Sequence, residues 1–360
     1  MTQLLGIRVP DDVGPLNHAA ACERLHGEAS ATATLARVFF LEEAVPSRQL
    51  WDRATRAAWQ RYGLLRQRGT RLQTRLRLDV VGEQYFLSDL RFRSPERGAL
   101  NLPAGDPVYP PSSDSLLLRD AVVSNDGTVL DLCTGSGIQA LSVATRARRV
   151  VAVDISARAA AMARANAALN AIANLEVRAG DLYRPVAGER FDTVIANPPF
   201  VASPYRKGPA YHSGGPTGTR VLQRLVTGLG PVLAPGGRFF AVSHLALRGA
   251  ETVADVLRPW FGDFPGRALA LVLESGSAID LAAAQALFAL AGGLAAYGAE
   301  VRRWVAYLRR HQVREIVLLL LVAEQAARRD LAVIEAFQRT FPMPVSYPPR
   351  HHLEQWLAAD

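Results

Sequence analysis

The tetrapeptide Asn197-Pro198-Pro199-Phe200 is the part of the sequence with the most definite chemical meaning. It follows Thr193–Ala196, an apolar run that predicts a buried strand. The two prolines would end that strand and fix the backbone, so that the Asn197 side chain and the Pro198 carbonyl point into a crevice. Two acceptors that hold the hydrogens of a planar amine favour the tetrahedral nitrogen that can attack a methyl group, while Phe200 offers a face for stacking. We therefore expect Asn197, Pro198 and Phe200 to be the catalytic residues of an enzyme that acts on nitrogen.

A glycine-rich turn comes earlier, between the expected strand Thr128–Cys133 and the expected helix Ile138–Ala147. Gly135 and Gly137 remove side chains where a ligand would approach the backbone closely. Their spacing also fits the dinucleotide fingerprint, which is a weak signal on its own. Asp131 separates the two interpretations, because its carboxylate would repel a pyrophosphate and attract a ligand that carries an ammonium and a sulfonium group.

Two more aspartates follow the next two expected strands. Asp154 ends Val150–Asp154 and can accept hydrogen bonds from both hydroxyls of a ribose, with Ile155 beside it. Asp181 follows the third strand and can accept from an adenine amino group while Leu182 packs against the ring. A single aspartate at a strand end is more often a helix N-cap, but three at successive strand ends favour one shared site.

Together these residues resemble the class I S-adenosylmethionine-dependent methyltransferases over about residues 105–325. Within that family they look like the N-methyltransferases with an Asn-Pro-Pro-Tyr/Phe motif (the HemK/PrmC-like subgroup), which modify exocyclic base amines or glutamine side-chain amides. The resemblance implies S-adenosylmethionine as the cofactor and no metal ion. It places the methionine part on the Asp131–Gly137 loop, the ribose on Asp154 and the adenine on Asp181, with Asn197 between the cofactor and the acceptor.

Two further segments would complete the acceptor side of this site. Residues 211–218 look like the Gly-Gly-x-x-Gly segment that follows the motif in the glutamine-modifying subgroup, and residues 109–115 lie where family members often close over the cofactor. His244 lies near the same edge, where it or the histidine of the first segment could accept a proton. We expect these segments to bring four residues near the substrate: Tyr109, Ser113, Tyr211 and His212.

The elements that must position these residues are short apolar strands that alternate with helices from about residue 115 onward. This alternation predicts an α/β fold with a parallel sheet covered by helices on both faces. We expect the Rossmann-like, seven-stranded sheet of the class I methyltransferases. The expected strands are Thr128–Cys133, Val150–Asp154, Leu175–Arg178, Thr193–Ala196, Arg238–Ser243, Ala268–Glu274 and Glu315–Ala323.

A long insert, residues 275–314, separates the sixth and seventh expected strands. The glutamine-modifying enzymes of the family end soon after the sheet, so this helical insert is a departure from their pattern. It would leave the sheet at the carboxyl edge, where ligands bind, and could form a lid over the acceptor site. The alternative is a helix pair that packs on the sheet or on a second subunit.

The Pro- and Gly-rich stretch Leu102–Pro111 predicts a boundary between an N-terminal accessory domain, residues 1–104, and a catalytic domain, residues 105–360. The first hundred residues look helical at first. Leu72–Val80 then alternates apolar and polar residues and Gln84–Asp89 returns, which predicts a half-buried β-hairpin. Helices followed by a basic hairpin resemble a winged-helix arrangement.

Positive charge is concentrated in the N-terminal part. The 360 residues carry 41 Lys and Arg against 33 Asp and Glu, a formal net charge of +8, and Lys207 is the only lysine. The stretch Arg48–Arg97 holds 12 Arg and 5 acids, or +7 of this total, so the catalytic domain is nearly neutral. Such a segment indicates a nucleic acid or an acidic protein as a partner, or else only the codon bias of an arginine-rich genome.

Cysteine usage and hydropathy indicate a cytoplasmic protein. Cys22 and Cys133 lie far apart, and no His/Cys cluster suggests a disulfide framework or a zinc site. The first residues lack the pattern of a signal peptide, and no apolar stretch predicts a membrane span. The sequence indicates no particular oligomeric state.

Three functions remain open on the sequence alone. The leading one is methyl transfer to an amine or amide nitrogen of a small molecule or a protein. The second is cyclisation of S-adenosylmethionine itself to azetidine-2-carboxylate and methylthioadenosine in natural-product biosynthesis, which needs no acceptor. The third is methylation of a base in rRNA, tRNA or DNA, and it depends on five arginines around the predicted hairpin: Arg66, Arg68, Arg71, Arg75 and Arg77.

Overall fold

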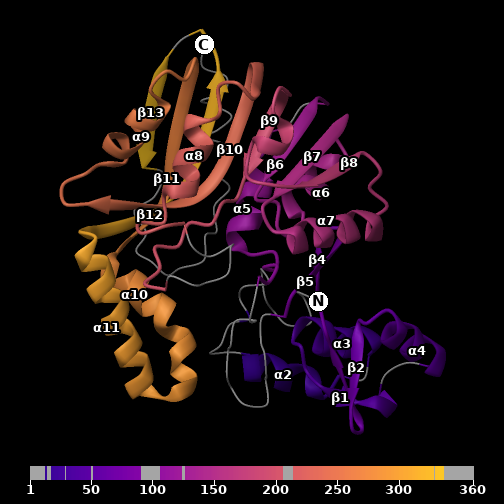
Figure 1. Ribbon diagram of the computed structural model, residues 1–360. Helices are drawn as coiled ribbons and strands as arrows, with labels where there is room; N and C mark the ends of the chain where they lie inside the picture. Colours follow the sequence, from indigo (N-terminus) through magenta and orange to yellow (C-terminus); the bar gives the residue numbers. More distant parts are fainter. Residues whose placement is uncertain are drawn as a thin grey trace. The chain divides into compact units, whose positions relative to one another are not determined.

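The computed structural model describes residues 13, 18–28, 30–49, 52–90, 106–123, 126–205, 214–327 and 329–335 (Figure 1). The chain divides into two compact units, Met1–Ser113 and Asp114–Asp360. Each unit has its own apolar clusters, and each is described by itself. Cys22 and Cys133 are both free thiols.

The first unit begins with helices and ends with short antiparallel strands. Its helical elements are α2 (His18–His26), α3 (Ala31–Leu35), the π-helical turn η2 (Ala36–Phe40), the 3-10 turn η3 (Ser47–Gln49) and α4 (Arg53–Arg61). Its strands are β1 (Val45–Pro46), β2 (Leu65–Arg68), β3 (Arg71–Thr74), β4 (Arg77–Val81) and β5 (Gln84–Ser88). They form a three-stranded sheet in the order β1-β3-β2 and a separate β4–β5 hairpin.

The alternating stretch 72–80 therefore forms two strands instead of the single strand that its pattern predicts. The chain breaks after β3, where Thr74 Oγ1 accepts a hydrogen bond of 3.2 Å from the backbone N–H of Leu76. Such a local side-chain contact competes with the sheet ladder. β3 pairs back to β2, and only β4 pairs with the returning strand β5.

The faces of β4 are also the reverse of the prediction. Arg77 and Asp79 are buried, and Val80 is 41% exposed. Arg77 Nε donates to Asp79 Oδ2 at 2.9 Å, and its Nη1 donates to the carbonyl of Phe40 at 2.7 Å and lies 3.7 Å from Glu42 Oε1. A buried charge must be paired in this way, so Arg77 is part of the interior of the unit and is not a surface cation.

The second unit contains one eight-stranded sheet, in the order β13-β11-β12-β10-β9-β6-β7-β8. The strands are β6 (Thr128–Leu132), β7 (Arg149–Asp154), β8 (Leu175–Ala179), β9 (Phe191–Ala196), β10 (Leu233–Arg248), β11 (Gly266–Ser277), β12 (Val313–Gln325) and β13 (Asp330–Glu335). The helical elements are α5 (Ser113–Ala121), α6 (Ile138–Ala144), α7 (Ala157–Leu169), η5 (Arg184–Val186), α8 (Arg220–Thr227), α9 (Val253–Phe261), α10 (Ala278–Ala286), η6 (Leu287–Gly292) and α11 (Leu294–Arg310).

This architecture confirms the predicted Rossmann-like α/β fold and corrects it at one end. All seven expected strands are present, but β12 runs antiparallel to β10 and β11, and β13 adds an eighth strand parallel to β11. β12 runs in the opposite direction because the chain leaves β11 and enters β12 at the same edge of the sheet, with α10 and α11 between the two strands (Figure 1). The carboxyl ends of the other main strands meet at that edge.

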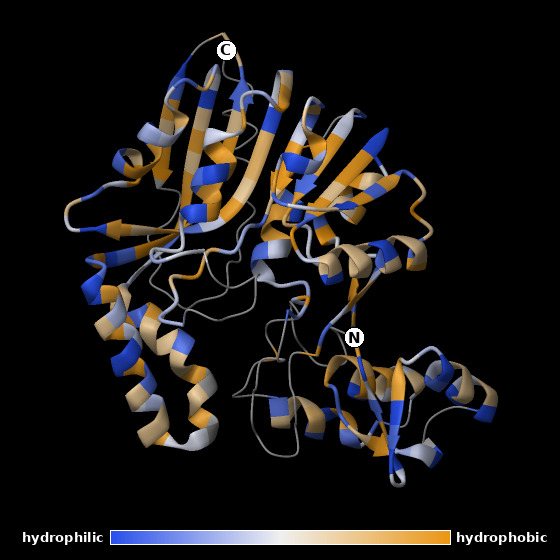
Figure 2. Cartoon of the chain, in the orientation of Figure 1, coloured by the Kyte–Doolittle hydropathy of each residue, from blue (hydrophilic) through white to orange (hydrophobic). Residues whose placement is uncertain are grey.

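Burial on both faces explains the apolar strands of this sheet, which are predominantly orange in Figure 2. Helices α8 and α9 cover one face and pack against Phe191 and Phe239, both of which are fully buried. Full burial of such a side chain contributes about 1.5–3 kcal/mol. Among the described residues, no helix has both the length and the apolar character that crossing a bilayer requires.

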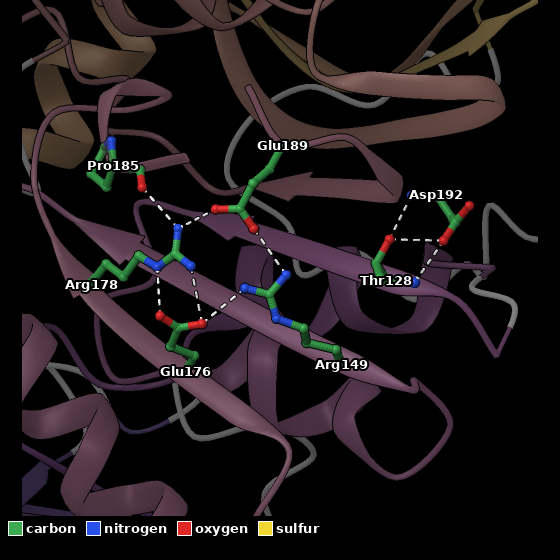
Figure 3. A network of polar contacts seen from close by, with 7 residues as sticks. All are labelled: Thr128, Arg149, Glu176, Arg178, Pro185, Glu189 and Asp192. Atoms are coloured by element: carbon green, nitrogen blue, oxygen red, sulfur yellow. Dashed lines mark hydrogen bonds and ion pairs between the residues drawn. The ribbon is translucent and has the colours of Figure 1, made fainter. Parts of the chain in front are cut away.

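The outer strand β8 carries a network of charges that all have opposite partners (Figure 3). Arg149 donates to Glu176 and to Glu189 at 2.9 Å each, and Arg178 Nε donates to Glu176 Oε1 at 2.8 Å. Arg178 and Arg149 hold the pKa of the Glu176 carboxyl at about 2, well below its usual value. Charged side chains at an edge strand discourage pairing with a second sheet.

Candidate active site

The three predicted aspartates converge around Cys133, which follows β6 with a positive φ of 60°. Burial raises the pKa of the Cys133 thiol, and the charges of Asp154, Asp131 and Asp181 raise it further. Because β6, β7 and β8 are parallel neighbours in the sheet, the residues that follow them lie at one edge. The topology therefore brings together the side chains that the sequence places at three successive strand ends.

Asp131 is fully buried beneath the glycine-rich turn and holds the shape of that turn. Its Oδ2 accepts hydrogen bonds from Thr134 Oγ1 at 2.5 Å and from the backbone N–H of Ala140 at 3.1 Å. Its Oδ1 is buried and has no hydrogen-bond partner among the described residues. Burial raises the pKa of the Asp131 carboxyl to about 7. A cationic ligand above the turn would favour its ionised form.

The two glycines of the turn have different reasons to be glycine. Both have positive φ, 55° for Gly135 and 87° for Gly137. A Cβ on Gly135 would meet no atom within 4 Å, so the backbone there faces open space into which a ligand fits. A Cβ on Gly137 would lie 2.9 Å from Leu141 Cδ1 and 3.3 Å from Ala163 Cβ. Gly137 therefore serves the packing of α6 on α7, and Gly135 borders open space; the contact of either glycine with the cofactor stays a prediction.

Asp154 is oriented by the backbone around it. Its Oδ2 accepts from the N–H of Gly135 and its Oδ1 from the N–H of Ser156, both at 2.9 Å. A carboxylate oxygen can accept more than one hydrogen bond, and the contact of Asp154 with a ligand hydroxyl stays a prediction. Ile155 next to it is 65% exposed, and its contact with a ligand ring stays a prediction.

Asp181 is held from α8, since Arg224 Nη2 donates to its Oδ2 at 2.7 Å. This contact lowers the pKa of the Asp181 carboxyl, which keeps it an anion and an acceptor. Leu182 has a positive φ of 48° and packs almost fully buried in the core of the sheet. Its contact with an adenine ring stays a prediction. We call Asp131, Gly135, Asp154 and Asp181 the carboxylate side of the site.

Asn197, at the end of β9, is oriented by the first turn of α5. Its Nδ2 donates to Asp114 Oδ2 at 2.8 Å and lies 3.4 Å from Ser115 Oγ. An ionised carboxylate only accepts, so Asp114 fixes which end of the amide is the donor. In the part of the chain that the structure describes, no group donates to Asn197 Oδ1. That oxygen is therefore an acceptor available to a substrate N–H.

Asp114 and Ser115 were not among the residues expected at the site. The segment 109–115 does contribute, but through these two side chains. Ser113 is the first residue of α5 and is assigned to the first unit, and its contact with a substrate stays a prediction. A Ser-Asp-Ser sequence before an apolar run has the pattern of a helix N-terminus, which conceals its second role. Tyr109 belongs to the first unit.

The ring of Phe200 lies against His244 of β10, with 4.5 Å between the ring centroids and a tilt of 49°. Burial lowers the pKa of the His244 imidazole to about 4, so this ring is neutral at physiological pH. The motif therefore has an uncharged aromatic surface on this side. Asn197, Phe200 and the turn Gly214–Gly218 are named here the Asn197 side.

The turn Gly214–Gly218 packs directly on the motif. The N–H of Gly214 donates to the carbonyl of Val201 at 3.2 Å. A Cβ on Gly214 would lie 2.7 Å from the Pro199 carbonyl oxygen, and one on Gly218 only 2.2 Å from that of Phe200. The glycines of this segment are thus required by close backbone approach. Tyr211 and His212 lie outside the described residues.

The insert contacts the Asn197 side through α11. α11 reaches the turn through Tyr307, whose Oη donates to the carbonyl of Pro216 at 3.0 Å. It reaches the chain after the motif through Arg303 Nη1, which donates to Tyr205 Oη at 2.7 Å. The same region packs as an apolar cluster whose buried members include Val201, Ala202, Leu281, Trp304 and Leu308. The insert is a fixed wall of the Asn197 side.

In the described residues, His, Cys, Asp and Glu side chains do not gather into groups of three or more that could hold a metal ion. The carboxylate side instead offers a buried unpartnered oxygen, an open glycine and two anionic acceptors. These features fit a ligand with cationic, hydroxyl and amino groups. The Asn197 side offers a neutral amide oxygen as a hydrogen-bond acceptor.

Residues 112–264 match the family model of the methyltransferase small domain. A provisionally named protein N5-glutamine methyltransferase of Methanocaldococcus jannaschii is 32% identical over 159 residues, which are 42% of this chain and 79% of that protein. A release factor glutamine methyltransferase of Thermodesulfovibrio yellowstonii is 26% identical over 229 residues, or 56% of this chain and 76% of that protein. The solved ribosomal protein L11 methylase of Lactobacillus delbrueckii subsp. bulgaricus is 27% identical over 36% of this chain and 57% of that chain, with a TM-score of 0.28.

Proposed function

The chain belongs to the HemK-like subgroup of the class I S-adenosylmethionine-dependent methyltransferases, enzymes of N-methyl transfer, and on this premise we propose that its acceptor is the side-chain amide nitrogen of a glutamine in a protein. The observation that carries the proposal is the orientation of Asn197. With its Nδ2 held by Asp114, it presents a neutral acceptor oxygen where a substrate N–H is expected.

The carboxylate side fits S-adenosylmethionine. Asp131, with its unpartnered Oδ1, favours the cationic methionine part, and the open space at Gly135 admits it. Asp154 would accept from the ribose hydroxyls and Asp181 from the adenine amino group, with Ile155 against the ring. When bound, the cofactor supplies a methyl group on a positively charged sulfur. A nitrogen lone pair can attack the methyl carbon, and the sulfur then leaves as a neutral thioether.

The Asn197 side addresses the weakness of an amide as a nucleophile. The lone pair of an amide nitrogen is delocalised into its carbonyl. Asn197 Oδ1 and the Pro198 carbonyl would accept the two N–H hydrogens and hold them out of the amide plane, which returns the lone pair to nitrogen. Phe200 would stack on the flat amide, and its uncharged neighbour His244 keeps this surface free of competing charge. Positioning supplies most of the acceleration, and the released proton passes to water.

The names of the relatives indicate which protein to try first. Two of them are named for glutamine methylation, and one for a release factor. The test is to incubate the chain with methyl-labelled S-adenosylmethionine and a purified bacterial release factor, then to locate the label by peptide mass spectrometry. We expect one methyl group on a glutamine, none on the factor with that glutamine changed to Asn, and none with Asn197→Ala.

Two results would contradict the proposal and identify an alternative. Methylthioadenosine formed from the cofactor alone, with no acceptor present, would indicate cyclisation of S-adenosylmethionine. Label on the exocyclic amine of a base, with protein glutamines unlabelled, would indicate a base methyltransferase. The first is read from a mixture without any acceptor and the second from one with added RNA or DNA, both by chromatography of the nucleosides.

A further inference from the structure

The hairpin β2–β3 of the first unit carries a row of arginines on one face. Paired residues in an antiparallel ladder share a face, and here Arg66 pairs with Gln73 and Arg68 with Arg71. Arg75 continues the row, because its N–H donates to the carbonyl of Leu64 at 2.9 Å and side chains alternate along the strand. We call Arg66, Arg68, Arg71 and Arg75 the arginine face.

The opposite face of the hairpin carries its buried leucines, so the exposed arginines of the arginine face point to solvent, while Gln73 on the same face is buried. Leu65 and Leu72 are buried in a cluster with Val45 of β1 and Phe39 of η2, and Trp59 of α4 packs on it. A shift of one residue in register would expose this cluster, so the orientation is strongly specified. Arg68, Arg71 and Arg75 are exposed, and Arg66 is half-buried.

Three of the four arginines of this face lack an acidic partner among the described residues. Residues 53–78 contain eight arginines and no acid. Within the described ranges, no carboxylate pairs with Arg66, Arg68 or Arg75. The pKa of Arg66 is lowered, first by burial and then by the charges of Arg68 and Arg75. The network on β8 shows the other arrangement of arginines in this chain, in which each has glutamate partners (Figure 3).

Arg71 shows that these side chains are held in place as well as exposed. Its Nε and Nη2 donate to the carbonyl of Ala44 at 3.1 and 2.5 Å. Arg66 Nη2 likewise donates to Gln73 Oε1 at 2.9 Å. For Arg66 the printed partner is neutral, so it orients the guanidinium group without cancelling its charge. A row of oriented, like-charged guanidinium groups is stabilised by an anion that spans several of them.

The composition of the face favours a phosphate backbone over an acidic protein. Protein interfaces usually have an apolar core, which this row of arginines lacks, whereas interfaces with nucleic acid are polar and strongly positive. Tyr62 lies in the turn before β2 and is 75% exposed. Arg75 borders that turn, since its Nη1 lies 3.9 Å from where a Gly63 Cβ would be. An exposed aromatic ring beside cations is a platform on which a base can stack.

We propose that the arginine face binds the phosphodiester backbone of a nucleic acid, with Tyr62 as a stacking residue. This function is additional to methyl transfer and does not depend on the acceptor. Guanidinium groups bind phosphate oxygens in pairs, and each phosphate neutralised releases counterions. Binding should therefore weaken steeply as salt is added.

The test measures binding of the full chain to labelled oligonucleotides of about 20 nucleotides by fluorescence anisotropy between about 50 and 200 mM salt. Single-stranded RNA, single-stranded DNA and double-stranded DNA of one sequence form separate arms, which identify the source of the phosphate. We expect the triple variant Arg68→Gln, Arg71→Gln, Arg75→Gln to lower the affinity at least tenfold. It should reduce the slope of log affinity against log salt by about 2–3.

A matched control removes three exposed arginines elsewhere, as Arg146→Gln, Arg258→Gln, Arg329→Gln, and should keep most of the affinity and slope. Thermal unfolding and circular dichroism of the full chain measure folding, including that of the first unit, and should be unchanged in both variants. Absence of binding in every arm at low salt would overturn the proposal. So would equal losses in the two triple variants, or binding to polyglutamate in preference to all nucleic acids, which would assign the face to an acidic protein.

Discussion

The carboxylate side and the Asn197 side of the site are built from different kinds of contact. On the carboxylate side, ionisable groups are held by backbone N–H donors and by one arginine. On the Asn197 side, an amide, an aromatic ring and two glycines are held by packing, and by an insert outside the basic sheet. The arrangement of the carboxylate side suits a ligand that is the same in every enzyme of the family. The second lets the acceptor change when the packing elements change.

The largest effect should come from Asn197→Ala on the Asn197 side. Removing the acceptor oxygen should lower kcat on the order of 10²–10³-fold, as for other preorganised groups that act at the reacting atoms. The two sides are separable only if the affinity for S-adenosylmethionine changes little in this variant. Calorimetric binding and single-turnover rates measure the two quantities independently. A parallel loss of cofactor binding would show that the division into two sides is wrong.

Asp114→Asn should have the next largest effect, about 10–100-fold on kcat, because an amide no longer fixes which end of Asn197 faces the substrate. Asp120→Asn is the matched control, since Asp120 lies on the same helix and, among the described residues, its polar contact is with Arg119 at the surface. Unchanged kcat in the control together with unchanged cofactor affinity in both variants would support a positioning role. Equal losses in the two variants would reduce Asp114 to a role in helix stability.

On the carboxylate side, Asp131→Asn should weaken cofactor affinity about tenfold with little change in kcat at saturation. The pKa of Asp131 is raised to about 7, so in the free protein ionisation of this group opposes stability as the pH rises through 7. A cation in the site reverses the preference and binds better when Asp131 is ionised. We therefore expect cofactor affinity to rise with pH through about 7 in the wild type.

The variant should lose this pH dependence and be at least as stable as the wild type at pH 8 without the cofactor. Thermal unfolding and calorimetric titration at several pH values between 5.5 and 8.5 measure both effects. A wild-type affinity that is flat with pH would contradict the assignment of a cation above Asp131.

The smallest effect should come from Tyr307→Phe, which removes the contact between α11 and the turn Gly214–Gly218. A single hydrogen bond contributes about 1 kcal/mol, so the KM for the acceptor should rise about fivefold while kcat and cofactor affinity stay within twofold. Tyr297→Phe is the control, because that hydroxyl only reaches Ala283 within the insert. Identical behaviour of the two variants would remove the insert from the acceptor site.

Sequence reasoning predicts the large sheet well, because strands buried on both faces are nearly continuous apolar runs. It also locates the carboxyl edge, where Asp131, Asp154 and Asp181 follow three such strands. It fails where a contact distant in sequence decides the outcome. The hydrogen bond from Asn197 to Asp114 joins residues 83 positions apart, and nothing local to either residue indicates it.

The first unit shows the same limit in another form. The alternation from Leu72 to Val80 predicts one strand with polar residues outside, but local turn chemistry at Thr74 divides it. Arg77 is then buried because Asp79 and Glu42 happen to face it in the interior. Periodicity shows which residues share a face of the strand. It does not show which face is buried, because that depends on the residues that pack against the strand. β13 was missed because it adds to an edge, where few apolar residues are needed.

The antiparallel course of β12 has a consequence for how such enzymes diversify. Ser277 at the end of β11 is opposite Glu315 near the start of β12, so the two strands are already adjacent where the insert departs. A tight turn could join them as well as the present helices do, and loop-closure cost grows only slowly with length. The connection between β11 and β12 is therefore a position where a segment can be inserted or replaced. Segments of different size and shape can be exchanged there to form a new acceptor wall, without disturbing the sheet that holds the methyl donor.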